Sequence, residues 1–410
     1  MSGTSPEHTQ RAGTFSRRGF LAGAAAAAMA RGRLNHAPAA EGNRKYRVGV
    51  IGHTGRGNYG HGLDRVWRDV PGCRIAGVAD ANEAGLAQAL KRLGVAKGYR
   101  DYRKMLEQVQ PDLVSICPRW LDQHRDMVVA AAERGVRGIY LEKPMCRTLA
   151  EADEMVAACK KRNVRLVIAH QTRYSPKLAV VREAIRDGLI GKVLEFRGRG
   201  KDDRRGGGED LWVLGTHVMN LIHVLGGPAR WCFGTVHQGG RPVAAKDVKP
   251  GAEGIGPLAG DEVHATYRLA GGATACFDSV RDARGNPSRF GLWIYGSKGV
   301  IRMATGHLPD AYVLADSSWS PGRTGRKWTA ISSAGVGKPE PLKDGGLHAG
   351  NVLAVRDLIA AVEGNTEPAG NVHEARAAAE MIVAVFESHR LSRPVTFPLT
   401  NRDNPLTMLR

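Results

Sequence analysis

The residue best suited to acid–base chemistry in this 410-residue chain is Lys143. It stands in Glu142-Lys143-Pro144, directly after the apolar run 138–141. Oxidising an alcohol by hydride transfer needs a base or a polarising cation beside the reacting carbon, because the hydroxyl proton must leave. Burial at an apolar strand end lowers the pKa of a lysine toward that role. A solvated Glu142–Lys143 pair at a helix start is the alternative that the local sequence leaves open.

His217 is the second candidate for proton transfer, and it lies in the mostly apolar stretch 211–220. A structural histidine packed at a domain interface is the alternative. Upstream, His170, Arg173 and Tyr174 follow another apolar run. They would offer hydrogen-bond donors and a ring face to a hydroxyl-rich substrate, or they are helix-start and packing residues.

A glycine-rich turn precedes these residues and predicts a nucleotide site. The β-rich run 46–51 leads into Gly-His-Thr-Gly-Arg-Gly at 52–57, and a helical stretch is predicted from there to about Val70. Strand, turn and helix in this order bring backbone N–H groups and a helix N-terminus to a pyrophosphate. Thr54 stands where the middle glycine of GxGxxG is expected, and Arg56 either contacts a phosphate or points to water. The predicted cofactor contacts in the turn are Gly52, Thr54, Gly55, Arg56 and Gly57.

An acidic residue follows the second predicted strand. The run 74–79 ends at Asp80, twenty-three residues beyond Gly57. A carboxylate at this place accepts hydrogen bonds from a ribose 2′-hydroxyl and repels a 2′-phosphate. The sequence therefore favours NAD as the cofactor, with NADP as the less favoured possibility.

The elements that must position these residues alternate between strands and helices. Apolar runs separated by amphipathic stretches predict a parallel sheet covered on both faces, with ligands at the carboxyl ends of its strands. The later runs are 113–117, 138–141 and 165–169, and the helical stretches are 82–93, 121–134 and 149–162. Cys117, Pro118, Glu142 and Lys143 lie at strand ends and are predicted to contact the cofactor.

Composition excludes several classes of protein. Lys and Arg number 59 against 40 Asp and Glu, a net charge of +19, but the excess is spread along the chain and no nucleic-acid motif accompanies it. The six cysteines form no CxxC pair, so a disulfide scaffold is not expected. No metal site is predicted, because His217 and His223 have the wrong spacing for one helical face and lack accompanying acids.

The first forty residues have the composition of an export signal. Arg17 and Arg18 precede the short alanine-rich stretch 21–30, which is too short to span a bilayer. This pattern resembles a twin-arginine signal, so residues 1–40 are expected to be a signal peptide and linker. We therefore expect contact with the twin-arginine export machinery, removal of the signal, a periplasmic location and no stable membrane anchor. A basic tail that stays in the cytoplasm is the alternative.

The order of these motifs resembles the glucose–fructose oxidoreductase/inositol dehydrogenase family from about residue 45 to the end. The motifs are the glycine turn, Asp80, Glu-Lys-Pro at 142–144, Arg-Tyr-Ser-Pro at 173–176, Gly-x-His at 215–217, Tyr295–Val300 and Glu374–Arg376. The resemblance implies an α/β fold with a Rossmann dinucleotide-binding domain over 41–170. A C-terminal α/β domain over 171–410, with an open and mostly antiparallel sheet, would carry the substrate side and often a dimer or tetramer contact.

The resemblance also implies roles for Lys143 and His217, with one departure. The family uses the lysine of Glu-Lys-Pro as its catalytic base, and its sugar dehydrogenases commonly carry an aspartate four residues before the histidine. Val213 occupies that place here. His217 would then work with Lys143 alone, or with Glu209 or Asp210.

Three functions follow as hypotheses. The first is an exported NAD(P)-dependent oxidoreductase that acts on a sugar or polyol and retains its dinucleotide tightly. The second is a glycoside-cleaving enzyme that oxidises a ring hydroxyl transiently and eliminates the neighbouring glycosidic bond. The third is a non-catalytic binding protein that retains the nucleotide.

Overall fold

The computed structural model describes residues 46–410. The predicted signal at residues 1–40, with Arg17 and Arg18, lies outside the described residues. Within 46–410, none of the helices combines the length and the apolar character needed to cross a membrane.

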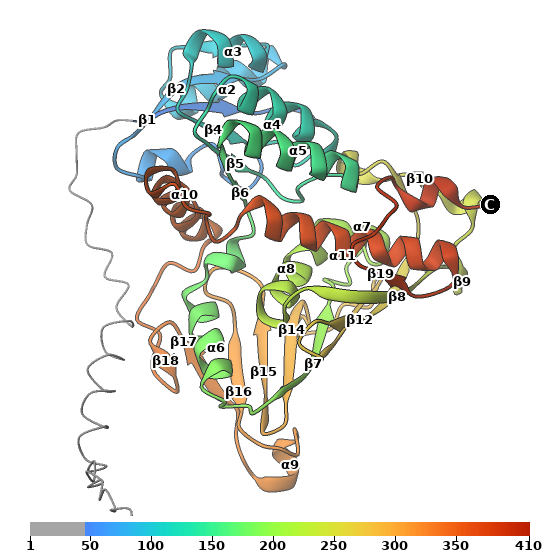
Figure 1. The fold of residues 1–410 in the computed structure, drawn as a ribbon. Helices are drawn as coiled ribbons and strands as arrows, with labels where there is room; N and C mark the ends of the chain where they lie inside the picture. The colour runs from blue at the N-terminus through green and yellow to red at the C-terminus, as the bar shows by residue number, and fades with distance from the viewer. Residues whose placement is uncertain (1–45) are drawn as a thin grey trace, which may run out of the picture. The chain divides into compact units, whose positions relative to one another are not determined.

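A six-stranded parallel sheet forms the N-terminal part, in the order β3-β2-β1-β4-β5-β6 (Figure 1). Every residue of β4 and β5 is buried, as expected for strands that are covered on both faces. The strands are β1 (Tyr46–Ile51), β2 (Cys73–Ala79), β3 (Gly98–Tyr99), β4 (Leu113–Ile116), β5 (Gly138–Leu141) and β6 (Arg165–Ile168). The predicted Rossmann architecture is confirmed.

The sheet is accompanied by the helices of the N-terminal part and by one helix from far along the chain. The helices of the N-terminal part are α2 (Glu83–Leu93), α3 (Tyr102–Val109), α4 (His124–Glu133) and α5 (Leu149–Arg162). On one face, α2 shares its core with α10 (Leu347–Gly364), a helix from far along the chain that also packs on β5 and β6. The predicted boundary at residue 170 falls between β6 and the short 3-10 helix η3 (Gln171–Tyr174).

The helix predicted after β1 is absent from the described chain, so that prediction was wrong. Turns follow β1 instead, and a single 3-10 turn, η1 (Val66–Asp69), precedes β2. Gly57, Gly60 and Gly62 have φ values of +89°, +60° and +84°, and Asn58 has +52°. These left-handed conformations do not propagate a right-handed helix. Helix α10 packs against η1 on the same face.

The C-terminal part is built on an open sheet of eleven strands. Every pairing in it is antiparallel except that of β7 with β13, so the predicted open, mostly antiparallel sheet is confirmed. Its strands are β7 (Val193–Arg199), β8 (Ala229–Gln238), β9 (Arg241–Pro242), β12 (Glu262–Leu269), β13 (Thr274–Val280), β14 (Gly291–Gly296), β15 (Gly299–Ala304), β16 (Ala311–Leu314), β17 (Thr329–Ser332), β18 (Gly335–Val336) and β19 (Val395–Thr396). A separate ribbon pairs β10 (Lys249–Pro250) with β11 (Pro257–Leu258).

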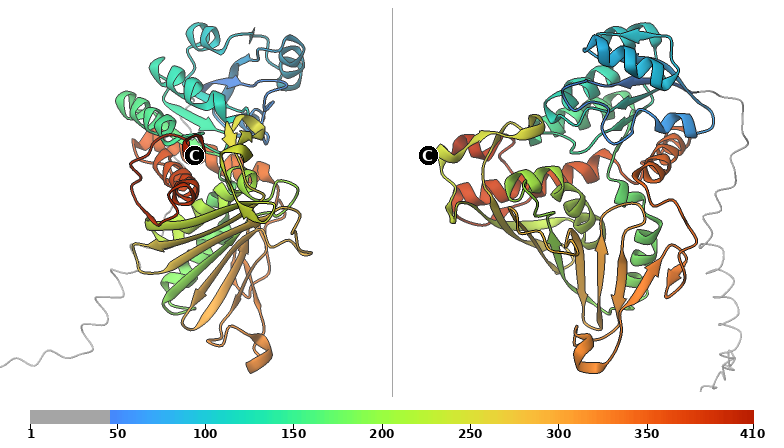
Figure 2. Two further views of the ribbon diagram at one scale, coloured as in Figure 1. Left: turned by 90° about the vertical axis from the view of Figure 1, so that its right-hand side faces the viewer. Right: turned by 180° about the vertical axis from the view of Figure 1, so that it is seen from behind.

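Helices pack on one face of this second sheet (Figure 2). Helix α8 contacts β7 and helix α11 contacts β8. Helix α11 also contacts α5 and β6 of the first part. These helices are α6 (Pro176–Arg186), α7 (Gly208–Val213), α8 (Gly215–Gly226) and α11 (Val372–Leu391), whereas the short α9 (Pro321–Thr324) lies at the tip of the sheet (Figure 1). Strand β6, η3, α8 and α11 therefore meet where the two sheets approach each other.

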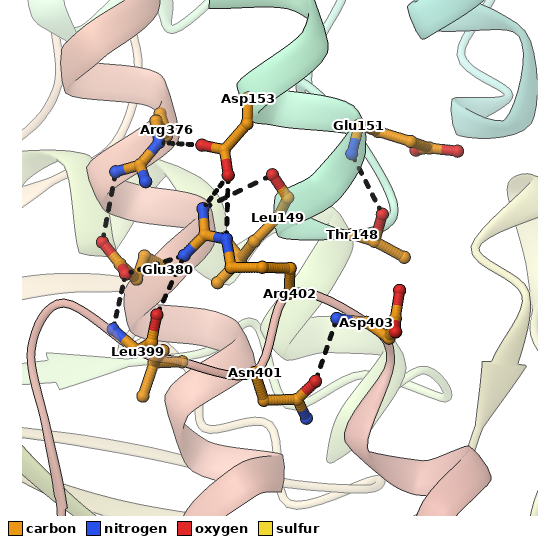
Figure 3. A network of polar contacts seen from close by, with 10 residues as sticks. All are labelled: Thr148, Leu149, Glu151, Asp153, Arg376, Glu380, Leu399, Asn401, Arg402 and Asp403. Carbon is orange, nitrogen blue, oxygen red and sulfur yellow. Dashed lines mark hydrogen bonds and ion pairs between the residues drawn. The ribbon is translucent and has the colours of Figure 1, made fainter.

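An ion-pair network joins the two parts at α5 and α11 (Figure 3). Asp153 on α5 accepts hydrogen bonds from Arg376 Nε at 2.7 Å and Arg402 Nε at 2.8 Å. Glu380 pairs with both arginines, and its carboxylate accepts a bond from the Leu399 backbone N–H. Burial alone would raise the pKa of Asp153, but the bonds from the two arginines outweigh burial and lower it. The network holds the C-terminal tail and α11 against α5.

Candidate active site

A crevice opens at the carboxyl ends of β1 and β2. It is a cavity of about 220 Å³ lined by two acidic residues, Asp80 and Asp101, and Asp80 is only 1% exposed. The lining residues include Gly52, His53, Asp80, Arg100, Tyr102 and Gln123. A cavity at this place in a doubly wound sheet is where a dinucleotide binds.

The chain's own donors already hold the Asp80 carboxylate. It accepts hydrogen bonds from the Thr54 backbone N–H, from Thr54 Oγ1 at 2.7 Å and from Tyr59 Oη at 2.9 Å. The Asn82 backbone N–H adds another at 3.0 Å. Thr54 therefore replaces the expected glycine with a side chain that orients the acid, and Tyr59 is a contact that the sequence reasoning missed. A ribose hydroxyl would share this carboxylate with Thr54 and Tyr59.

The glycine turn packs closely against the loop that follows β4. A Cβ on Gly57 would lie 2.4 Å from the backbone nitrogen of Arg119, so the position requires glycine. Gly55 is exposed and open, whereas Gly52 lies under the Tyr59 ring. Arg56 forms an ion pair with Asp122, and its guanidinium lies 5.0 Å from the centre of the Trp120 ring. The Arg56 side chain is 44% exposed beside Asp122, and its contact with a phosphate stays a prediction.

A buried histidine joins the two loops that follow β4 and β5. His124 approaches the carbonyl oxygen of Pro118 through Nε2 at 2.7 Å and that of Pro144 through Nδ1 at 2.9 Å. The Cys117 thiol is buried against Ser115, and burial raises its pKa. Neither Cys117 nor Pro118 is among the residues that line the crevice, so their contact with the cofactor stays a prediction.

A second cavity, of about 180 Å³, brings Lys143 and His217 together. We call it the reaction cavity. Its lining combines the end of β5, the loop after β1, η3 and the start of α8. The lining residues are His61, Lys143, Gln171, Thr172, Leu214, His217, Phe290, Thr305, Gly306 and Leu347.

Lys143 has the environment of a base. The residue is 4% exposed, and its Nζ donates a hydrogen bond to the Val213 carbonyl oxygen at 2.9 Å. Burial lowers the pKa of the amine, and the neighbouring Glu142 carboxylate opposes that effect. Val213, which occupies the place of the family's aspartate, thus contacts Lys143 through its backbone.

His217 on α8 and His170, which directly precedes η3, lie edge to face with ring centres 5.5 Å apart. Burial, reinforced by the charge of Lys143, lowers the pKa of His170 to about 3 and holds the pKa of His217 well below its ordinary value. His170 Nε2 contacts Thr216 Oγ1 at 2.9 Å. Among the described residues, the buried His217 Nδ1 has no hydrogen-bond partner. These environments favour the neutral form of both rings.

The acids considered as partners of His217 are placed elsewhere. Asp210 accepts hydrogen bonds from the Ser279 hydroxyl at 2.6 Å and from the Asp202 backbone N–H. Glu209 lines a different, solvent-open cavity of the C-terminal part. Neither acid contacts His217 in the part of the chain that the structure describes.

Arg173 and Tyr174 contact the C-terminal helices. Arg173 forms an ion pair with Glu374 at 2.9 Å. The Tyr174 hydroxyl donates to Asp357 at 2.9 Å and accepts from the Gly370 backbone N–H. Neither residue is among those that line the reaction cavity, whereas the preceding residues of the same turn, Gln171 and Thr172, are.

A carboxylate–imidazole pair borders the reaction cavity. Glu142 is fully buried, and its Oε1 lies 2.7 Å from His61 Nδ1. The structure thus pairs Glu142, a predicted cofactor contact, with a histidine that the sequence reasoning missed. The signal that could have found His61 is its place in the glycine-rich loop after β1, which also carries the cofactor-binding turn.

Comparison with known families agrees with this architecture. Residues 46–170 match the model of the oxidoreductase family with an NAD-binding Rossmann fold. Residues 178–302 match the GFO/IDH/MocA C-terminal domain. Together the two matches cover more than half of the chain.

Two relatives illustrate the range of chemistry in similar proteins. A levoglucosan dehydrogenase from Pseudarthrobacter phenanthrenivorans is 29% identical over 249 residues, which cover 55% of this chain and 63% of that enzyme. A 2,7-anhydro-N-acetylneuraminate hydratase from Mediterraneibacter gnavus is 31% identical over 141 residues, 34% of this chain and 36% of the relative. The chain therefore spans between about a third and just under two thirds of the lengths of these relatives.

The fold as a whole also matches solved structures. A levoglucosan dehydrogenase in complex with NADH and L-sorbose superposes with a TM-score of 0.70 at 22% identity, covering 87% of this chain and 99% of that one. The crevice beside Asp80 and the close-packed glycine turn fit the dinucleotide that the family model implies. This chain belongs to the GFO/IDH/MocA oxidoreductase family and carries its NAD-binding Rossmann domain.

Proposed function

We propose that this protein is an NAD-dependent oxidoreductase that acts on a secondary hydroxyl of a sugar or polyol. The observation that carries the proposal is the buried amine of Lys143, which lies beyond the end of β5 in one cavity with His217. Its lowered pKa gives the amine a neutral fraction that can accept a proton. The similar dehydrogenase that acts on levoglucosan supports the substrate class.

The residues of the chain divide the work of the reaction. Bound NAD supplies a hydride acceptor at the substrate carbon. As the hydride leaves the carbon, the substrate O–H bond breaks and a new N–H bond forms at Lys143 Nζ. The Val213 carbonyl orients the amine by accepting one of its hydrogens. His217, Gln171 and Thr172 provide hydrogen-bonding groups for other hydroxyls of the substrate.

The test combines cofactor retention with turnover. Native mass spectrometry of the purified protein is expected to show bound NAD or NADH. Levoglucosan and myo-inositol with NAD⁺, and L-sorbose with NADH, then form a panel that is read at the absorbance of NADH.

Lys143→Met is expected to lower turnover by about 10²–10⁴-fold, the range of a direct acid–base group. Lys192→Met, at an exposed lysine, is the control and should keep the wild-type rate. Retained nucleotide without turnover of any substrate would contradict the proposal and favour a binding protein.

A second candidate function is glycoside cleavage through transient oxidation. Val213 replaces the family's aspartate, and the similar hydratase shows that related chains carry out chemistry other than net oxidation. Oxidation of a ring hydroxyl acidifies the neighbouring C–H, the glycosidic bond breaks by elimination, and return of the hydride restores NAD. Release of p-nitrophenol from aryl glycosides without net NADH formation would support this candidate over the first.

We also propose export through the twin-arginine machinery, with the dinucleotide bound before translocation. The support is the Arg17-Arg18 pair and the alanine-rich stretch that follows it. Cell fractionation of the wild type and of the Arg17→Lys, Arg18→Lys double variant tests this proposal. Export of both at the same rate would contradict it.

The open face of the second sheet is the surface we propose for a homo-oligomer, which native mass spectrometry measures directly.

A further inference from the structure

The loop after β1 carries a histidine into the reaction cavity. The left-handed residues that prevent a helix there bring His61 beside Lys143 and His217 in the lining. Its side chain is 32% exposed, whereas Glu142, on its Nδ1, is fully buried. His61 thus links a buried carboxylate to the solvent side of the cavity.

The position of His61 is fixed from two directions. Asn351 on α10 donates from Nδ2 to the His61 carbonyl oxygen at 3.0 Å. Asn351 is fully buried, and its Oδ1 accepts bonds from the Tyr140 hydroxyl at 2.7 Å and from Gln171 Nε2 at 3.1 Å. Asn351 on α10 therefore holds the His61 backbone and is itself held by residues of β5 and η3.

The carboxylate side of the pair is equally constrained. A Cβ on Gly60 would lie 2.8 Å from Glu142 Oε2 and 2.5 Å from the Cys117 carbonyl oxygen, so the loop backbone lies directly on the acid. Within residues 46–410, Glu142 Oε2 is buried and has no hydrogen-bond partner. The Oε1 contact with His61 is therefore the polar contact that this carboxylate makes, and because a carboxylate oxygen accepts, the hydrogen of this bond lies on Nδ1.

The proposed reaction creates a need for such a pair. Lys143 accepts a proton at every oxidation, and it must lose that proton before the next one although it is only 4% exposed. His170 and His217 are poor acceptors near pH 7, because burial and the charge of Lys143 depress the pKa of each. Among the histidines that line the reaction cavity, His61 is the one paired with a carboxylate.

We propose that His61, oriented by Glu142, is a second proton-transfer residue of the reaction cavity, and this inference rests on the proposed function. Nδ1–H donates to Glu142, which leaves the lone pair of Nε2 free. An N–H bond of the Lys143 ammonium breaks, a new N–H bond forms at His61 Nε2, and the proton then passes to water. This chain thus has its carboxylate–imidazole pair at residues 142 and 61, whereas the family pattern would have one at residues 213 and 217.

The test separates a chemical role from a structural one. His61→Ala is assayed with levoglucosan and NAD⁺ first and then with the other substrates of the panel. We expect kcat to fall by about 10-fold to 100-fold, with KM changing less than kcat, and added imidazole to restore part of the rate. NADH retention, measured by native mass spectrometry, should stay at the wild-type level. His348→Gln, which breaks the exposed pair with Asp69, is the matched control and should keep the wild-type rate.

A second variant keeps the test decisive if His61→Ala folds poorly. Glu142→Gln preserves the shape of the acid and should lower kcat in the same range, and adding it to His61→Ala should cost little more. Unchanged kcat in both variants would overturn the inference, and so would a loss of activity in His61→Ala that imidazole does not restore. In either case the proposed function still stands if Lys143→Met is inactive. A wild type that turns over no substrate refutes the proposed function and this inference with it.

Discussion

Replacing Val213 by aspartate puts a carboxylate beside the buried amine of Lys143. The backbone carbonyl of Val213 already lies 2.9 Å from Lys143 Nζ, and residue 213 is 3% exposed. A negative charge there favours the ammonium form, so the pKa of Lys143 rises. The base must be neutral to accept the hydroxyl proton. As the pH is lowered, kcat/KM should therefore begin to fall at a higher pH in the variant than in the wild type.

The size of the shift follows from the separation of the charges. At a distance of about 5 Å and an effective dielectric constant of about 20, two unit charges interact by about 3 kcal/mol. That interaction corresponds to a pKa change of about two units. A tenfold or larger loss of kcat/KM near pH 7 is therefore expected, with recovery at alkaline pH.

The assay is the pH profile of kcat/KM for the wild type, Val213→Asp and Val213→Asn. The asparagine variant has the same shape without the charge, so it controls for packing and for disturbance of α7. The assignment concerns the fall of kcat/KM at low pH, which we attribute to protonation of Lys143. It would be refuted if this fall stays at the same pH in Val213→Asp, or if it moves equally in Val213→Asn.

Two further predictions concern the cofactor crevice and the joint between the two parts. Gly57→Ala should abolish NADH retention, because its Cβ would lie 2.4 Å from the Arg119 backbone nitrogen. Gly94 also has a positive φ but no close neighbour, so Gly94→Ala is the control and should keep the cofactor. Native mass spectrometry measures the bound NADH in both variants. Asp153→Asn should lower the free energy of unfolding by about 1 kcal/mol at pH 7, because the pairs are partly exposed and screened. The folded-state pKa of Asp153 is lowered, so its contribution is present above the unfolded pKa of about 3.9 and disappears as pH falls through the folded value. Melting curves between pH 3 and 7 measure this, with the exposed Glu154→Gln as control; a difference independent of pH would contradict the pairing.

The strand and helix alternation of the first part was predictable from the sequence, because apolar runs with turn residues between them carry the parallel sheet. The lack of a helix after β1 was not predictable, because the residues there have a helix-like pattern while Gly57, Gly60 and Gly62 take left-handed conformations. Three glycines in six residues were the available signal. That one local difference also brings His61 to the cavity and leaves room for α10, which arrives from almost three hundred residues away.

The candidate site was predictable in its centre and less so at its edges. Lys143 could be placed because it follows a strand whose end must face the crevice. The partners of Arg173 and Tyr174 are Glu374 and Asp357, about two hundred and one hundred and eighty residues along the chain, and no local pattern indicates such contacts. The use of a threonine hydroxyl to hold Asp80 likewise depends on side-chain geometry that spacing alone does not specify.

The central claim is that the nicotinamide ring binds where the amine of Lys143 can reach the reacting carbon. A crystal structure of the NADH complex tests this most directly. The account predicts the ring at the mouth of the reaction cavity, with its C4 atom facing the space between Lys143 and His217. A ring bound outside this cavity, or a crevice that stays empty at saturating NADH, would contradict the account.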